Sequence, residues 1–73
     1  LTPLEFGVAS YLWQRPGKAV SRTDLLNDVW GLSYEGGSNV VDTVVASLRK
    51  KLGEWAKVIE TVTGTGYRYR SRD

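Results

Sequence analysis

The feature that constrains the fold most is a helical segment followed closely by a glycine-turned hairpin. In residues 39–52, apolar side chains recur at the spacing of one helix face, at Val41, Val45, Leu48 and Leu52. Residues 58–63 are rich in β-branched side chains, and residues 67–70 alternate tyrosine with arginine. Between them, Gly64-Thr65-Gly66 predicts a turn, because both glycines are free to adopt positive φ. The pattern therefore predicts one amphipathic helix beside a two-stranded hairpin.

Size and composition exclude most chemistry. The 73 residues predict one small domain, residues 1–73, near the lower size at which a single apolar core suffices. The sequence has no Cys and no His, so it lacks the usual disulfide, zinc-binding and general-base residues. The carboxylates of Glu5, Asp24 and Asp42 each have a role at a helix start, so a catalytic pair is not expected. We expect no enzyme, no metal and no cofactor.

Charge favours an anionic partner. The net charge is +2 and the pI about 9.2, and basic residues gather in the second half, at Arg49-Lys50-Lys51 and at Arg68, Arg70 and Arg72. No apolar run approaches the length of about eighteen residues that suggests a membrane span, and these 73 residues show no signal-peptide pattern. We expect a cytoplasmic protein without a membrane partner. The start at Leu1, without Met, predicts a piece of a longer chain.

A first helix is predicted from its capping residues. Thr2 suits the N-cap, Pro3 the first helical position and Glu5 the third, which completes a capping box. The helix should end before Arg15-Pro16-Gly17, because the residue before proline avoids the helical region. Its buried stripe is predicted at Phe6, Ala9, Leu12 and Trp13, with Leu4 and Tyr11 outside the stripe.

A second helix should follow a short extended link at residues 18–20. Ser21 suits its N-cap with Asp24 three residues on, and Gly31 suits its end. Residues 31–38 then predict a loop, and Ser38 or Asn39 is expected to cap the third helix. The second helix would bury Leu25, Leu26, Val29 and Trp30. The fold class predicted is α+β, mostly α, with three helices followed by a C-terminal β-hairpin.

The exposed side of the third helix points to nucleic acid. It carries small polar residues that allow a close approach to base edges: Asn39, Thr43, Ala46, Ser47 and Lys50, with Arg49 flanking. The arginine face of the hairpin, Arg68 and Arg70, suits phosphate contact. Tyr67 and Tyr69 present an alternative, stacking on unpaired bases, although their alternation favours packing on the core. A helix beside such a hairpin suits duplex DNA, with one element in the major groove.

Several motifs, in this order, resemble the effector domain of OmpR/PhoB-type response regulators. They are Leu1-Thr2-Pro3-Leu4-Glu5-Phe6, Arg15-Pro16-Gly17, Asn39-Val40-Val41-Asp42 and Gly64-Thr65-Gly66-Tyr67-Arg68. The resemblance implies a winged helix-turn-helix that binds specific duplex DNA as the output domain of a two-component system. It implies that the family's N-terminal β-sheet and receiver domain are not in this chain. It also implies that helix 39–52 is the recognition helix, in the major groove, and hairpin 61–70 the wing, on the adjacent backbone or minor groove.

The resemblance also implies site residues and partners. Loop 31–38 would contact RNA polymerase through Tyr34 and Glu35, the domain would form a head-to-tail homodimer on direct repeats, and a sensor histidine kinase would act on the receiver domain. Relatives often carry basic residues where this chain has Ala46, Ser47 and Thr63. The expected DNA-binding residues are Asn39, Val40, Thr43, Val44, Ser47, Arg49, Lys50, Thr63, Tyr67 and Arg68.

Two other functions stay open at this point. The reduced set of arginines is compatible with a winged helix that mainly binds protein, either polymerase through residues 31–38 or a sister domain. Single-strand binding through Tyr67 and Tyr69 is the third possibility. If duplex DNA is the partner, Val40 and Val44 suit thymine methyl groups and Asn39 an adenine edge, which favours an A·T-rich half-site.

Overall fold

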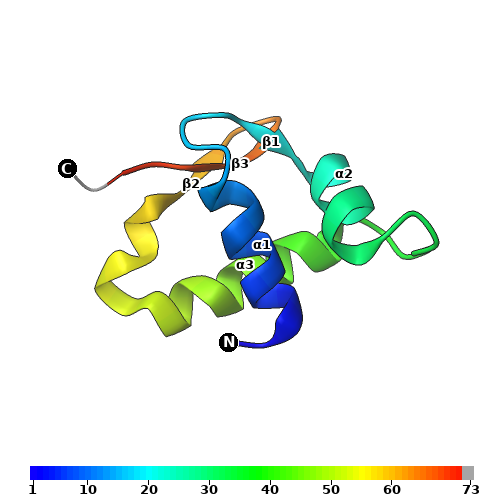
Figure 1. The fold of residues 1–73 in the computed structure, drawn as a ribbon, viewed down its shortest axis with the longest axis horizontal. Coiled ribbons are helices and arrows are strands. Elements are labelled where there is room, and N and C mark those ends of the chain that lie inside the picture. The colour runs from blue at the N-terminus through cyan, green and yellow to red at the C-terminus, as the bar shows by residue number, and fades with distance from the viewer. Residues whose placement is uncertain (72–73) are drawn as a thin grey trace.

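Three helical segments and a small antiparallel sheet make up the computed structural model, which describes residues 1–71 (Figure 1). Arg72, counted in the basic C-terminal segment, lies outside the described residues. The predicted fold class, mostly helical with a C-terminal hairpin, is confirmed. The elements are α1 (Pro3–Trp13), β1 (Val20–Ser21), α2 (Arg22–Leu25), the π-helical turn η1 (Leu26–Trp30), α3 (Asn39–Leu52), the 3-10 helix η2 (Gly53–Val58), β2 (Ile59–Val62) and β3 (Gly66–Tyr69).

Helix α1 begins with the predicted capping box. The Glu5 N–H donates to Thr2 Oγ1 at 3.2 Å, and the Thr2 N–H donates to Glu5 Oε1 at 2.8 Å. Both bonds satisfy N–H groups that the first turn of a helix leaves without partners. Pro3 occupies the start of the helix, as expected. The prediction from the first five residues is therefore confirmed.

The buried face of α1 differs from the predicted one. Glu5, Val8 and Leu12 are buried, whereas Phe6 is 62% exposed and Trp13 is 65% exposed. Apolar side chains lie on nearly every side of this helix, so their spacing does not select one face. The carboxylate of Glu5 turns inward because it finds partners there. The prediction that Phe6 and Trp13 form the buried stripe was wrong.

Tyr11, which lay outside the predicted stripe, has its partner within the domain. Its ring packs against the core, and its hydroxyl donates to Asp28 Oδ2 at 2.5 Å. Arg15 lies over the ring, with the guanidinium carbon 3.6 Å from the centroid. Leu4, the other apolar residue outside the predicted stripe, is 38% exposed. Tyr11 therefore joins α1 to η1.

Strand β1 replaces part of the predicted link between the first two helices. Val20 pairs with Tyr67 and Ser21 with Gly66, so the sheet has the order β1-β3-β2. Val20 is 2% exposed. Two residues are too few for a strand pattern to be visible in the sequence. Only the pairing with β3 makes this segment a strand.

The helical segment formed by α2 and η1 begins and ends where the sequence predicted. The Asp24 N–H donates to Ser21 Oγ at 3.0 Å, and Gly31, with a φ of 108°, ends the helical segment. The second half of the segment, η1, is π-helical, and the Gly31 N–H reaches Leu26 O at 2.9 Å. Leu25 is fully buried. The other predicted apolar positions are partly buried against the core: Leu26, Val29 and Trp30.

Helix α3 confirms the predicted bounds and the predicted buried stripe. Val41, Val45 and Leu48 are buried and Leu52 is partly buried. The N-cap is Ser38, but its side chain makes no capping bond in the structure. Gly53 ends the helix with a φ of 59°, and residues 53–58 form the 3-10 helix η2.

The hairpin of β2 and β3 turns at Gly64. This residue has a φ of 81°, and the Thr65 N–H donates to Val62 O at 3.0 Å. Gly66 lies in β3 without a positive φ, so only Gly64 uses the conformational freedom that both glycines offer. A Cβ on Gly66 would lie 2.1 Å from Val20 O, so this glycine is needed for the close approach of β1.

The core lies where α1, α2, α3 and the sheet meet. Among residues 1–71, no helix has the length and apolar character that a membrane crossing needs. The core residues are Val8, Leu12, Val20, Leu25, Val41, Val45, Leu48, Ile59 and Tyr67.

Candidate nucleic-acid interface

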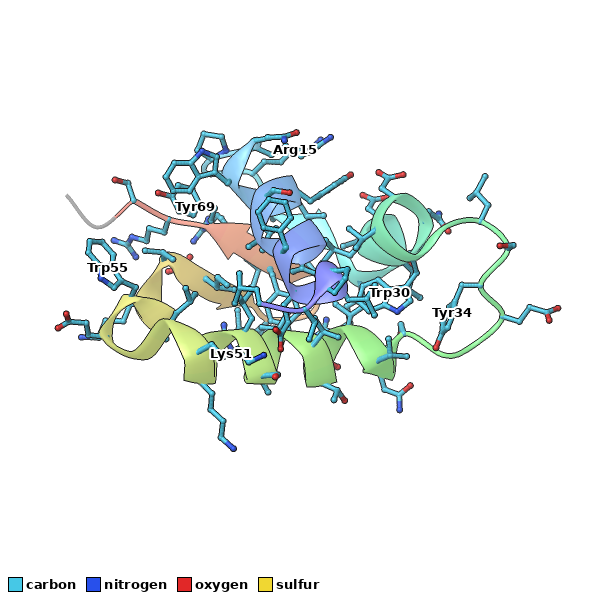
Figure 2. All side chains as sticks on the ribbon, turned by 60° about the horizontal axis from the view of Figure 1, so that its bottom comes forward. Arg15, Trp30, Tyr34, Lys51, Trp55 and Tyr69 are labelled. Carbon is cyan, nitrogen blue, oxygen red and sulfur yellow. The ribbon has the colours of Figure 1, made fainter. Side chains whose placement is uncertain are left out.

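Helix α3 turns one side away from every other element (Figure 2). Four side chains spaced three or four residues apart are exposed on this side. The Thr43 hydroxyl donates back to Asn39 O at 3.3 Å, as threonine often does in helices. We call these four residues the α3 ridge: Asn39, Thr43, Ala46 and Lys50. The ridge is narrow and polar, as the sequence predicted.

The flank of α3 that faces α1 holds other predicted site residues. Val44 packs against the core, and Val40 is partly buried. The Ser47 hydroxyl donates to Glu5 Oε2 at 2.6 Å, and Lys51 Nζ lies 2.8 Å from Glu5 Oε1. Ser47 therefore lies beside the ridge, against α1, rather than on it.

Glu5 holds α1 and α3 together through its carboxylate. The side chain is 4% exposed and accepts bonds from Lys51, Ser47 and the Thr2 N–H. These donors favour the charged form, the Lys51 bond most, then Ser47, then Thr2, and they lower the pKa of Glu5 to about 2. The ionised carboxylate therefore stabilises the contact between the helices.

The shifted pKa of Glu5 predicts loss of stability in acid. Because the folded-state pKa, about 2, lies below the ordinary value of 4.5, the contribution of Glu5 is complete above pH 4.5 and is lost as the pH falls toward 2. Melting temperatures measured between pH 7 and pH 2.5 should fall less steeply for Glu5→Gln than for the wild type, from a lower starting value. Glu35→Gln, in the exposed loop, should follow the wild type. Identical slopes for all three proteins would contradict this role for Glu5.

The other flank of α3 faces the hairpin. Arg49 donates from Nε and Nη2 to Ile59 O, at 3.2 and 2.6 Å, and from Nη2 to Thr61 Oγ1 at 3.0 Å. Its guanidinium carbon lies 5.5 Å from the centroid of the Tyr67 ring. Arg49 was predicted as a DNA contact, and the structure places three of its hydrogen bonds on β2.

Tyr67 is a core residue with a hydrogen-bonded hydroxyl. The residue is 4% exposed, and its hydroxyl donates to Asp42 Oδ1. Asp42 Oδ1 also accepts from Arg22 Nε at 2.8 Å. The Tyr67 bond and then the Arg22 bond lower the pKa of Asp42, while burial and then Asp42 raise the pKa of Tyr67. This burial leaves the Tyr67 ring no face on which a base can stack.

Tyr69 also packs within the domain, as its alternation with arginine favoured. Its ring lies 5.0 Å from the Trp13 ring, centroid to centroid, at an interplanar angle of 45°. Both tyrosines thus lie on the inner side of β3. The single-strand hypothesis loses its stacking platform.

The arginines of the hairpin are paired with a carboxylate. Arg68 stands opposite Glu60 in the β2–β3 register and forms an ion pair with Glu60 Oε1. Arg70 Nη1 lies 3.0 Å from Glu60 Oε2. These bonds lower the pKa of Glu60, that of Arg68 most. A phosphate would have to compete with Glu60 for these arginines, whereas Thr63 at the hairpin turn is exposed.

Loop 31–38 projects from the end of the molecule near the start of α3 (Figure 2). Leu32 is 85% exposed and Tyr34 is 38% exposed, and Glu35 is also exposed. The Tyr34 N–H donates to Gly31 O at 3.1 Å, and the Tyr34 ring lies 6.5 Å from that of Trp30. The loop therefore presents the two predicted polymerase-contact residues at the surface.

Sequence reasoning missed four residues that organise this surface. It gave Glu5 and Asp42 helix-start roles, and it assigned no role to Glu60 or Arg22. The capping pattern at Thr2 and Glu5 indicated one of the hydrogen bonds of Glu5. Its other partners, Ser47 and Lys51, follow more than forty residues later, so no local pattern indicates them. Among residues 1–71, no group of acidic residues is arranged to hold a metal ion.

Comparison with known proteins gives the same family throughout. A family model described as "Transcriptional regulatory protein, C terminal" matches residues 1–69. The chain is 41% identical over 73 residues to the transcriptional regulatory protein SrrA of Staphylococcus aureus and 39% identical over 69 residues to YkoG of Bacillus subtilis. These alignments cover 94% and 92% of this chain but 30% of each relative. The chain therefore spans less than a third of their length.

Solved structures agree with the fold. The DNA-binding domain of Bacillus subtilis CssR superposes with a TM-score of 0.86 at 40% identity, covering 94% of this chain and 76% of that one. The RstA DNA-binding domain of Klebsiella pneumoniae, solved with the RstA box, gives a TM-score of 0.82 at 32% identity, with coverages of 96% and 72%. The chain thus belongs to the family of OmpR/PhoB-type winged-helix domains, the C-terminal DNA-binding domains of transcriptional regulators rather than enzymes.

Proposed function

We propose that this domain reads specific duplex DNA by placing the α3 ridge in the major groove and the hairpin on the adjacent backbone or minor groove. The observation that carries this is the ridge itself, a narrow polar surface on a helix that the major groove can admit. The hairpin is fixed beside this helix. The AdeR and RstA DNA-binding domains, solved with an intercistronic region and with the RstA box, support it as relatives.

The exposed residues suggest distinct roles. On the ridge, Asn39 suits an adenine edge, Thr43 a base edge and Lys50 a phosphate. Val40, partly buried on the flank, suits a thymine methyl group. Thr63 at the hairpin turn suits the backbone. Arg68 would bind a phosphate after giving up its ion pair with Glu60. Val44 and Ser47 would reach DNA only from the flank of the ridge.

Replacing Lys50 by alanine tests the placement of α3. Because a phosphate contact carries no sequence information, Lys50→Ala should weaken binding to all duplexes alike and reduce the slope of log affinity against log salt by about 1. Lys57→Ala removes the same charge from η2, away from the ridge, and should change both quantities less. Equal effects of the two substitutions on affinity would show that only total charge matters. If Lys50→Ala leaves the affinity unchanged, α3 does not contact DNA.

A gel-shift experiment at low salt separates the three classes of function. Binding of a random-sequence duplex, followed by selection of preferred duplexes from a random pool, is the expected result. If no duplex binds, the domain acts mainly through protein contacts. If single strands compete as well as duplex, the ridge does not read a groove.

We further infer partners that lie beyond this domain. Tyr34 and Glu35 on the projecting loop would contact RNA polymerase, with exposed Leu32 adding apolar surface. The relatives are about three times longer than the alignment, which fits a receiver domain acted on by a sensor histidine kinase in a two-component system. On DNA, the domain would act as a head-to-tail homodimer on direct repeats. Because its partner is DNA, the protein would work in the cytoplasm. Pull-down of polymerase with wild type and Tyr34→Ala would test the loop contact.

A further inference from the structure

A continuous set of contacts crosses the molecule from β2 through α3 to α2. It runs from Thr61 to Arg49, past the Tyr67 ring to Asp42, and ends at Arg22. We propose that Arg49 and Tyr67 are positioning residues, which fix the hairpin on α3 so that ridge and hairpin meet DNA together. The proposal rests on the function proposed above and assigns these two residues an indirect role in it.

The Arg49 contact is a fixed attachment rather than a loose surface pair. A planar guanidinium holds one backbone oxygen, Ile59 O, with two nitrogens and reaches Thr61 Oγ1 with one of them. Ile59 itself is buried, so the oxygen belongs to a strand anchored in the core. A guanidinium engaged in this way has less capacity for a phosphate. The same bonds, however, set the distance between α3 and β2.

The Tyr67 contact attaches the hairpin to α3 at a second point. The ring is buried, and its hydroxyl reaches Asp42, whose carboxylate is also held by Arg22. The Arg22 guanidinium carbon lies 5.1 Å from the centroid of the same ring. Three elements, β3, α3 and α2, therefore meet at one carboxylate.

The two attachments are placed where together they restrict rotation of the hairpin on α3. Asp42 and Arg49 are seven residues apart, which is two helical turns and about 10 Å along one side of α3. One attachment would let the hairpin pivot in any direction, whereas two leave only rotation about the line that joins them. A surface that must fit two grooves at once gains affinity when its parts are fixed before binding.

Substitutions that leave the net charge unchanged test this role. Arg49→Lys keeps the charge but loses the fork, and Tyr67→Phe loses only the hydroxyl. Tyr69→Phe is the matched control, because Tyr69 lies on the same strand face and packs on Trp13 by its ring. The probe is a duplex that the wild-type domain selects from a random pool. Because the chain has no Cys, a cleavage reagent tethered to Thr63→Cys can map where the hairpin lies on it.

The decisive measurement compares the full duplex with one shortened to remove the segment that the reagent cleaves. Arg49→Lys and Tyr67→Phe should each lose affinity for the full duplex on the order of tenfold, the scale of coupling between contacting groups, and should match the wild type on the short one. Cleavage from position 63 should spread over more nucleotides in both variants. Tyr69→Phe should behave as the wild type on both duplexes.

Other outcomes would overturn the proposal. Equal loss on both duplexes means that Arg49 touches DNA in the major groove or that the variants disturb the fold as a whole. No loss on either duplex means that the attachments do not guide binding. If Lys50→Ala also has no effect, the proposed function fails as well, which separates the two ideas.

Discussion

Gly66→Ala should destabilise the domain by about 3 kcal/mol, the upper part of the usual cost of forcing extra volume into a packed site. The new Cβ would lie 2.1 Å from Val20 O and 3.1 Å from both Ser21 Cα and Arg22 N. All three atoms are backbone, so no side-chain rotation relieves the clash. Strand β1 must separate from β3 or the hairpin must bend. Urea denaturation followed by tryptophan fluorescence measures the loss.

Gly64→Ala is the control for this prediction. Gly64 has a φ of 81° but open space around it, so alanine there meets backbone strain and no clash. It should cost about 1 kcal/mol. If Gly66→Ala proves no worse than Gly64→Ala, β1 is not held against β3 at the distance seen here.

Leu48→Ala should have a comparable effect, about 3 kcal/mol, because it leaves a cavity at the centre of the core. Leu48 is fully buried on the inner side of α3. A domain of this size has a total stability of about 4–11 kcal/mol, so the variant should lie close to unfolding at moderate temperature. Thermal unfolding measures the shift.

Leu32→Ala removes the same atoms from a surface position. Leu32 is 85% exposed in the loop, and its replacement should change stability by less than about 0.5 kcal/mol. Similar losses at both leucines would mean that the loop is packed rather than projecting. Together the pair tests whether α3 turns its leucine stripe inward.

Local signals predicted much of the fold correctly. Helix α3 and its stripe were visible because a helix repeats its inner face every three or four residues, so Val41, Val45 and Leu48 identify each other. The capping box at Thr2 and the ending glycine at Gly31 depend on neighbours within a few residues. Each of these features depends on residues within one element, and each was confirmed.

The prediction of the buried face of α1 failed because the deciding partners lie far along the chain. The inner face of α1 includes Glu5, a charged residue, because Ser47 and Lys51 supply its hydrogen bonds. Phe6 and Trp13, more apolar than Glu5, are exposed instead. Periodicity ranks faces by hydrophobicity and does not include the partners that a charge can find after folding.

The candidate site shows the same division. The sequence by itself determined a small winged helix with a polar ridge on α3 and a hairpin beside it, because helix period and turn chemistry are local. Only the tertiary structure decided which polar groups remain available, since Arg49, Tyr67 and Arg68 meet partners on other elements or strands. A guanidinium or hydroxyl bonds whatever the fold brings within about 3 Å, and that distance is set by packing rather than by sequence spacing.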